Sequence, residues 1–363
     1  MFLSIREIRS AGGRFILIGS VTMFITLLII MLTGLTQGLA ARNTSALSSL
    51  DADAVAFVDP FSDTPEVSFS NSVATEDAAR AVTAAASQVT GRGLDAIVPL
   101  GVGQTRLESD QGAQPVAVLG LPDGTVAAGV AVGKQANISE SIATELGLST
   151  GDTIALGGTE VTVGQIVADE YYSHSPVVWV DIATWQQVSH AEAATTGTVL
   201  LAYGDATAQQ WDTIAADTHT AITDTKGSFE GLAAYKSERT SLTSMQGFLY
   251  GISALVTISF LSVWTLQRTR DIAVLRALGA SPRYVLADAL TQAAIILAVG
   301  TGAGALIGFG LGALVSGTVP FELSWLTIAG PAVAVFVLGI AGALLAVRQT
   351  TKVDPMTALG ASV

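Results

Sequence analysis

Apolar residues gather into four long runs in this sequence, at about residues 15–40, 247–266, 290–315 and 325–347. Each run is free of charged residues over about 20 positions, the length at which an α-helix crosses about 30 Å of hydrocarbon. Helices buried in soluble proteins rarely extend so far without a charge, so the hydropathy favours membrane spans over core helices. The pattern therefore predicts four transmembrane helices.

The first run ends in small residues, Gly38-Leu39-Ala40-Ala41, which resemble a signal-peptidase cleavage site. A cleaved signal peptide is therefore an alternative to a membrane anchor. The apolar stretch is longer than the 7–15 residues that are typical of a signal peptide. An uncleaved first transmembrane helix is the expectation that fits this length.

Basic residues flank the four runs unevenly and set the expected orientation. Three arginines precede the first run, four lie between the second and third, and two basic residues follow the fourth, whereas residues 316–324 contain none. Cytoplasmic segments carry the excess of lysine and arginine, so both termini and the segment after the second run are expected in the cytoplasm. The chain is expected to be a multi-pass protein of the bacterial plasma membrane.

The expected fold class is a membrane α-helical protein with four transmembrane helices and a large α+β extracytoplasmic domain inserted between the first and second. The expected order is a cytoplasmic amphipathic segment 1–14, a first span 15–40, an extracytoplasmic domain and stalk 41–246, a second span 247–266, a cytoplasmic loop 267–286, a third span 287–315, a short outer loop 316–324, a fourth span 325–347 and a cytoplasmic tail 348–363.

The inserted segment, residues 41–246, contains 8 basic and 25 acidic residues and mixes strand-like with helix-like patterns. Strands are expected near 51–59, 96–102, 115–120, 153–168 and 176–180, and helices near 76–88, 138–147 and 206–217. The Gly157-Gly158 pair predicts a tight turn between two paired strands. This mixture of strands and helices is typical of an α+β domain. We find no internal repeat in the segment.

Catalytic and metal-binding motifs are missing from the sequence. It has no GxxxxGK[ST] loop, so the chain is not expected to hydrolyse ATP itself. It has no GxSxG or HExxH motif, and His174, His190 and His219 are expected to be solvated loop residues. A net charge of −13 disfavours nucleic-acid binding, and the absence of cysteine excludes disulfides. Ion-coupled transport is disfavoured because no charge is expected deep in the spans.

Three separated motifs resemble those of FtsX/MacB-type ABC transporter permeases. The segment 267–282 reads QRTRDIAVLRALGASP, residues 353–359 read VDPMTAL, and residues 142–154 carry an ATELGL…GDTI pattern. The order of one span, an exterior domain and three further spans is also similar to that family. The resemblance implies a permease that works as a homodimer with two copies of a cytoplasmic ABC ATPase. ATP would be bound by that partner, and no intrinsic cofactor is implied.

The resemblance assigns the segment after the second span to the coupling helix, which contacts the ATPase. The implied coupling residues are Arg270, Ile272, Leu275, Arg276, Leu278 and Gly279. Apolar residues on one face of a short helix suit a groove on a partner protein. The alternative interpretation is a basic interfacial helix held by anionic membrane lipid.

Closely spaced glycines mark the third and fourth predicted spans. They are Gly300, Gly302, Gly304, Gly308, Gly310 and Gly312 in the third span, and Gly339 and Gly342 in the fourth. Small residues let helix backbones approach closely. Tight packing within one bundle is the first interpretation, and a seam between two copies of the chain is the second.

The approach to the second span, residues 229–245, is similar to the corresponding stretch of HrtB-type haem-efflux permeases. Its residues suit haem chemically, because tyrosine and methionine are known haem ligands, a carboxylate can bind ferric iron, and cations can meet the propionates. The candidate haem-binding residues are Glu238, Tyr235, Met245, Glu230, Arg239 and Tyr250, with Lys236 as a second candidate for the propionates. The alternative is that the tyrosines are interfacial aromatics, Glu238 is a solvated residue and Met245 serves packing.

Three functions remain open on the sequence. The first is haem export, the second is export of another hydrophobic substrate such as an antimicrobial peptide or a macrolide, and the third is an FtsX-like regulator of a cell-wall hydrolase that transports nothing. A haem spectrum separates the first from the second. Capture of a hydrolase by the exterior domain would favour the third.

Overall fold

The computed structural model describes residues 12–91, 93–267, 274, 279 and 281–350. The chain forms two compact units, one made of residues 1–38 and 240–363 and the other of residues 39–239. The first unit is helical, and the second contains all of the strands in the described residues.

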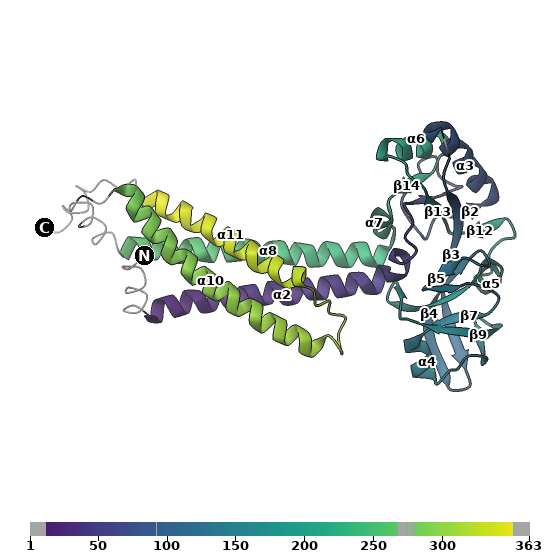
Figure 1. Ribbon diagram of the computed structural model, residues 1–363, viewed down its shortest axis with the longest axis horizontal. Helices are drawn as coiled ribbons and strands as arrows, with labels where there is room; N and C mark the ends of the chain where they lie inside the picture. The colour runs from purple at the N-terminus through teal and green to yellow at the C-terminus, as the bar shows by residue number, and fades with distance from the viewer. Residues whose placement is uncertain (1–11, 92, 268–273, 275–278, 280, 351–363) are drawn as a thin grey trace. The chain divides into compact units, whose positions relative to one another are not determined.

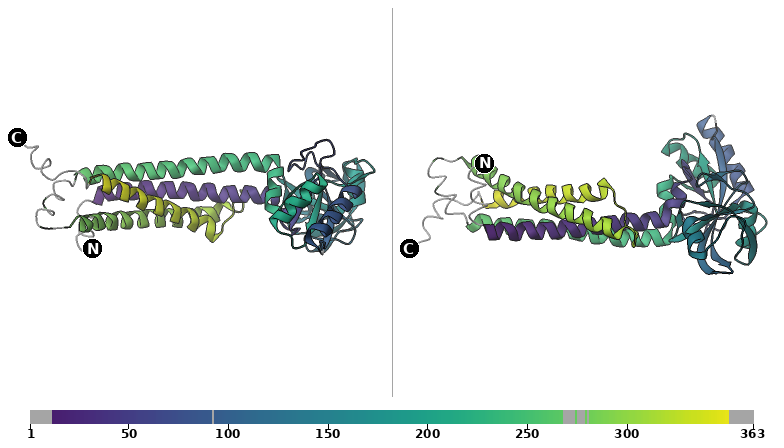
Figure 2. Two further views of the ribbon diagram at one scale, coloured as in Figure 1. Left: turned by 90° about the horizontal axis from the view of Figure 1, so that it is seen from above. Right: turned by 60° about the horizontal axis from the view of Figure 1, so that its bottom comes forward.

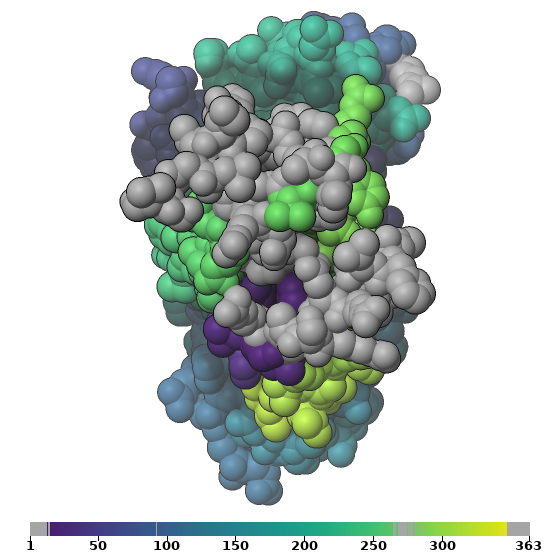
Figure 3. Space-filling model, turned by 90° about the vertical axis from the view of Figure 1, so that its left-hand side faces the viewer, coloured from purple at the N-terminus to yellow at the C-terminus, as the bar shows by residue number. Residues whose placement is uncertain are grey.

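Four long helices make up the described part of the helical unit: α2 (Gly12–Ser48), α8 (Ala233–Gln267), α10 (Pro282–Val315) and α11 (Trp325–Thr350). All four are long and apolar enough to cross a membrane, as predicted. Figure 2 shows that successive helices run in opposite directions, so the start of α2 and the end of α11 share one end of the unit. The start of α2 is visible in purple at that end in Figure 3. The side of the membrane on which this end lies stays a prediction.

The helix α10 begins earlier than the third span expected at 287. Ser281 caps it by accepting a hydrogen bond from the Tyr284 N–H at 3.2 Å, and Pro282 occupies the first turn. Near its start Asp288 Oδ2 accepts a hydrogen bond from Gln292 Nε2 at 2.9 Å. Gln292 is fully buried, so one polar pair lies at this end of the bundle.

Glycines of α10 bring its backbone close to α2. A Cβ atom added at Gly300, Gly304 or Gly308 would lie 2.6–2.9 Å from α2 atoms, whereas Gly302 and Gly310 have nothing within 4 Å in this chain. Glycine at the first three positions lets α10 approach α2 closely, and any side chain there would push the two helices apart. Packing within one bundle therefore accounts for Gly300, Gly304 and Gly308.

The exterior unit is built on one large sheet (Figure 1). Its strands are β1 (Ala54–Phe57), β3 (Ala96–Ser109), β4 (Gly112–Leu121), β7 (Ala136–Ser139), β8 (Thr153–Leu156), β9 (Thr159–Val167), β10 (Tyr171–Tyr172), β11 (Ser175–Asp181), β13 (Val199–Tyr203) and β14 (Ala221–Thr223). Two small sheets pair β2 (Ala74–Thr75) with β12 (Thr195–Gly197) and β5 (Val126–Ala127) with β6 (Val130–Ala131). The remaining helices are α3 (Glu76–Thr90), α4 (Glu140–Leu146), α5 (Ile182–Val188), α6 (Ala208–Thr218), α7 (Thr225–Ser228) and the 3₁₀ turn η1 (Phe229–Gly231).

Six strands of the large sheet pair in a closed ring. Strand β3 pairs with β4, β4 with β11, β11 with β7, β7 with β9, β9 with β8, and β8 with β3 again. A core of buried aliphatic residues and Trp185 belongs to this ring and to helices α4 and α5. The other end of β3 continues through β13 and β1 to β14, against which α3 and α6 pack. The long strand β3 thus contributes side chains both to the core of the ring and to the core beneath α3 and α6.

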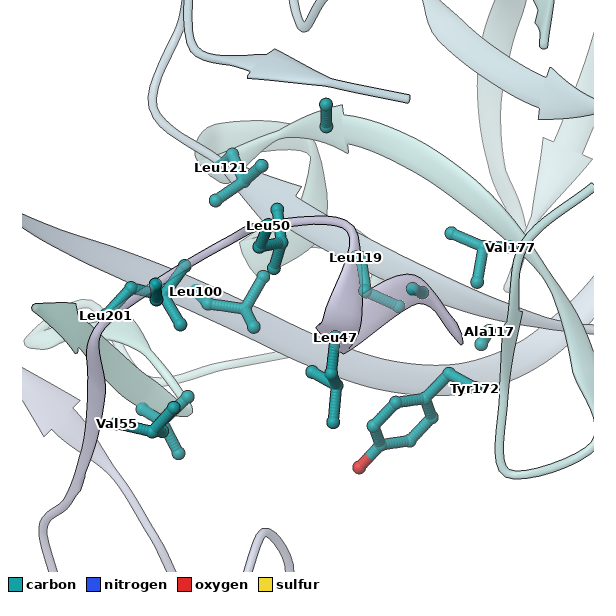
Figure 4. Packing of buried hydrophobic residues seen from close by; sticks show 14 of the residues in the cluster. Leu47, Leu50, Val55, Leu100, Ala117, Leu119, Leu121, Tyr172, Val177 and Leu201 are labelled. Carbon is teal, nitrogen blue, oxygen red and sulfur yellow. The ribbon is translucent and has the colours of Figure 1, made fainter. Parts of the chain in front are cut away.

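The end of α2 and the turn after it contribute to the largest core of the exterior unit. Figure 4 shows Leu47 and Leu50 beside Leu100, Leu119 and Leu201 of the sheet. These side chains are nearly or completely excluded from solvent, and burying a leucine contributes about 1.5–3 kcal/mol. The last turns of α2 are therefore part of the exterior unit rather than a free connection.

Most local predictions for the exterior domain are confirmed. The Gly157-Gly158 turn joins β8 to β9 as expected, and strands or helices lie at each remaining predicted position. The helix expected over 138–147 begins only at Glu140, because the buried residues 136–139 pair between β11 and β9 as strand β7. The α+β fold class is confirmed.

Candidate functional site

The carboxylate of Glu238, one of the predicted haem-binding residues, is held by two side chains in the exterior unit. His174 Nε2 lies 2.7 Å from Glu238 Oε1, and Asn43 Nδ2 donates to Glu238 Oε2 at 3.0 Å. Each carboxylate oxygen therefore has one partner. The Glu238 side chain remains 33% exposed and the His174 side chain 40% exposed, so a ligand from outside can reach this cluster.

A tight turn places His174 in this cluster. Tyr172 pairs with Ser175, which leaves Ser173 and His174 as the two-residue connection between β10 and β11. Both have positive φ, 48° and 66°, the conformation that Asn-Gly usually supplies in such a turn. Residues other than glycine pay about 1–2 kcal/mol each for this conformation. A strained turn at a polar cluster is typical of functional sites.

Backbone hydrogen bonds fix the tip of this hairpin against α2. The Ser173 N–H donates to the Asn43 carbonyl at 3.0 Å, and the His174 N–H donates to the Arg42 carbonyl at 2.9 Å. Asn43 is buried, and its Nδ2 also reaches the Leu39 carbonyl at 3.0 Å. The cluster thus joins the end of α2, the start of α8 and the β10–β11 hairpin.

A second group of predicted residues lies around Tyr235. Its side chain is only 8% exposed and packs edge to face on Phe229, with the ring centres 5.8 Å apart. Arg239 donates to the Tyr235 hydroxyl at 3.1 Å and to Glu230 Oε1 at 3.0 Å. The three predicted residues Glu230, Tyr235 and Arg239 therefore contact one another, and the Arg239 guanidinium already has a carboxylate partner.

Arg42, which precedes Asn43 in the chain, presents a second cation in this region. Its guanidinium lies 4.3 Å from the centre of the Tyr171 ring, a cation–π contact. Among the described residues no carboxylate pairs with it. Its own backbone carbonyl accepts the His174 N–H, so Arg42 and the hairpin share one surface. An unpaired guanidinium is suited to binding a carboxylate of a ligand.

Glu170 is a half-buried acid next to strand β10 in the chain. Trp179 Nε1 donates to its Oε2 at 3.2 Å. Burial raises the pKa of Glu170, while hydrogen bonds from Ser49 and Trp179 act in the opposite direction. Burial likewise raises the pKa of Tyr172. Tyr172 is buried and Glu170 half-buried, whereas the side chains of Glu238 and His174 are 33% and 40% exposed.

The structure brings the predicted residues into separate settings. Tyr235, Glu230 and Arg239 form one cluster, and Glu238 lies in another with His174 and Asn43. Met245, 54% exposed, and Tyr250, half-buried, belong to the helical unit.

Sequence analysis missed Asn43 and did not foresee the contact between His174 and Glu238. His174 is an exposed loop residue, as predicted, but its Nε2 lies 2.7 Å from Glu238 Oε1. A signal for the turn was available in the sequence. Residues 173 and 174 form a two-residue connection between the strand residues Tyr171-Tyr172 and the strand that begins at Ser175.

The coupling prediction falls almost entirely on residues that the structure does not describe. Arg270, Ile272, Leu275, Arg276 and Leu278 lie outside the described residues. Gly279 is described, and its φ of 97° is a conformation that glycine adopts readily. The assignment of this segment to an ATPase contact stays a prediction.

Comparison with protein families defines the class of the helical unit. Residues 244–355 match the family described as FtsX-like permease C-terminal. This segment, which begins within α8 and takes in α10 and α11, is therefore an FtsX-like permease domain. The resemblance to FtsX/MacB-type ABC transporter permeases is confirmed.

Individual relatives share more of the chain at moderate identity. A protein of Staphylococcus epidermidis named as a hemin transport system permease protein, HrtB, is 29% identical over 230 residues, which cover 63% of this chain and 64% of that protein. Its namesake from Staphylococcus haemolyticus is 26% identical over 375 residues, covering 99% of both chains. The macrolide export ATP-binding/permease protein MacB of Wolinella succinogenes is 32% identical over 124 residues, covering 33% of this chain and 19% of that protein.

Proposed function

We propose that this chain is the permease subunit of an ABC efflux transporter and that its substrate is haem. The observation that carries the proposal is the partly exposed carboxylate of Glu238, which His174 and Asn43 hold at the start of α8. The FtsX-like permease domain and the two relatives named for hemin transport support it.

In this function the chain works as a homodimer in the bacterial plasma membrane, with both termini cytoplasmic. Two copies of a cytoplasmic ABC ATPase bind and hydrolyse ATP, and segment 267–286 receives the resulting motion. Membrane lipid surrounds the four apolar helices. Haem enters sideways from the membrane, and closure of the dimer expels it.

The chemistry of the site suits ferric haem. A carboxylate oxygen is a hard ligand for ferric iron, and each oxygen of Glu238 keeps a lone pair beyond the one it uses in its hydrogen bond. Glu238 is our first candidate for the iron ligand. Tyr235, Met245, Glu230 and Tyr250 remain candidates, of which Tyr235 is the least accessible because its ring is buried.

Removing the Glu238 carboxylate is expected to weaken haem binding at least tenfold. Hemin titrated into the full-length protein in detergent should give a stoichiometric Soret shift with the wild type. The shift should weaken with Glu238→Ala and persist with Glu145→Ala, which removes an exposed carboxylate from α4. Unchanged binding by Glu238→Ala would move the iron ligand elsewhere, and the absence of a Soret shift with the wild type would overturn haem as the substrate.

Arg42 is expected to bind a haem propionate, because Arg239 already pairs with Glu230. Arg42→Gln should lower the affinity for hemin about tenfold or more, because a charge-assisted contact is worth about 1.5–3 kcal/mol. The same substitution should leave the affinity for hemin dimethyl ester unchanged, since the ester carries no propionate charge. An equal loss for both ligands would show that Arg42 acts through the fold alone.

Two other functions remain as alternatives. Export of an antimicrobial peptide or a macrolide is favoured by the similarity to MacB over part of the chain. ATPase activity of the assembled complex that rises with such a molecule and not with hemin would support it. A non-transporting regulator would instead retain a cell-wall hydrolase on its exterior domain.

A further inference from the structure

The turn that carries His174 has its backbone fixed against α2. Positive φ at Ser173 and His174 and the two backbone hydrogen bonds to α2 fix the backbone from which the imidazole reaches Glu238. The other two histidines, His190 and His219, also have positive φ, but no side-chain hydrogen bond joins either ring to a described residue. His174 is thus distinguished by its partner and not by its backbone alone.

The contacts around Glu238 occupy both oxygens of its carboxylate. Asn43 Nδ2 can only donate, and it donates to Oε2. His174 Nε2 lies 2.7 Å from Oε1 and 3.2 Å from Asn43 Nδ2, so the three side chains contact one another. Each carboxylate oxygen has two lone pairs and one partner, so one lone pair on each oxygen stays available to a cation.

A free glutamate side chain has several rotamers, and only some would direct its oxygens toward a ligand at the surface. Side chains that ligate metals are commonly oriented by hydrogen bonds from a neighbouring shell, and loss of such a partner typically weakens metal binding about 10–100-fold. His174 and Asn43 are such hydrogen-bonding neighbours of Glu238. They come from two other elements, α2 and the β10–β11 hairpin, so the orientation does not depend on α8 alone.

We propose that His174 and Asn43 are positioning residues, which hold the Glu238 carboxylate in the orientation that binds ferric haem iron. His174 fixes Oε1 and Asn43 fixes Oε2, and neither residue contacts the iron. This inference rests on the proposed function, because it assigns the ligand of Glu238 to haem.

The test is a hemin titration of the full-length protein in detergent, followed by absorbance and by electron paramagnetic resonance of the ferric iron. His174→Phe removes the donor to Oε1 and should weaken hemin binding about tenfold and alter the iron signal. His174→Gln retains an N–H donor and should restore most of the affinity and the wild-type signal. His190→Phe is the matched control, an exposed histidine with positive φ, and should behave as the wild type.

A second substitution keeps the test independent of the strained turn. Asn43→Ala removes the donor to Oε2 and should weaken hemin binding in the same direction as His174→Phe. Elution as a single folded species on size exclusion, at the wild-type position, identifies the variants whose affinities can be compared.

The outcomes separate this inference from the proposed function. Wild-type affinity and signal in both His174→Phe and Asn43→Ala would overturn the positioning role and leave haem export standing. Complete loss of the Soret shift in His174→Phe, without rescue by His174→Gln, would make His174 an iron ligand and would also overturn it. A wild-type protein that binds no hemin would overturn the proposed function and this inference together.

Discussion

Replacing Trp185 by alanine is expected to destabilise the exterior unit by about 3–5 kcal/mol, the usual cost of removing a buried tryptophan. The indole is 3% exposed and lies against Gly101 and Gly120, which face each other on β3 and β4. A Cβ at either glycine would overlap the Trp185 side chain. The surface beneath the indole is the backbone of two paired strands, so it cannot move in to fill the space that the indole leaves.

Thermal unfolding of the full-length protein in detergent, followed by tryptophan fluorescence, measures this effect. For a unit of about 200 residues the loss corresponds to roughly 6–20 °C in the unfolding midpoint. Trp185→Phe retains a flat ring and should lose less than Trp185→Ala. A midpoint for Trp185→Ala within about 2 °C of the wild type would contradict the packing described for this side chain.

Replacing Gly304 by valine is expected to disrupt the helical unit. A Cβ at this position would lie 2.6 Å from the Met23 carbonyl oxygen and 2.8 Å from Thr26 Cβ of α2. The obstacle is another helix backbone, so the helices must separate rather than a side chain rotate. Overpacking typically costs about 1–3 kcal/mol, and a backbone clash lies at the upper end or beyond.

Gly302→Val is the matched control for this substitution. It makes the same chemical change in the same helix, with the same loss of helix propensity, but a Cβ there meets nothing within 4 Å in this chain. The fraction of protein that elutes as a single species on size exclusion in mild detergent should fall for Gly304→Val and stay near wild type for Gly302→Val. Equal losses for the two variants would show that the contact with α2 does not decide stability.

The helical unit could be predicted from the sequence because a membrane span is a local property. About 20 apolar residues suffice to identify one, and all four were identified. The Gly157-Gly158 turn was also predictable, since it depends on two adjacent glycines. The beginning of α4 was not, because the strand pairs made by residues 136–139 override their local preference.

The closed ring of strands and the Glu238 cluster depend on contacts between distant residues. Strand β4 pairs in parallel with β11, which lies about 60 residues further along the chain. No local sequence pattern predicts that pairing. His174 and Glu238 are 64 residues apart, and Asn43 is 195 residues from Glu238. The sequence therefore indicated Glu238 as a candidate but could not reveal which side chains orient it.

The ring of strands has a consequence for how the exterior unit meets other proteins. Within the described residues, the large sheet ends in β10, two residues long, and β14, three residues long. Long open edges invite other chains to add a strand, whereas short or closed edges resist such addition and the aggregation it causes. A protein that binds this unit must therefore recognise its side chains and loops, and its specificity can be changed by surface substitutions that leave the sheet intact.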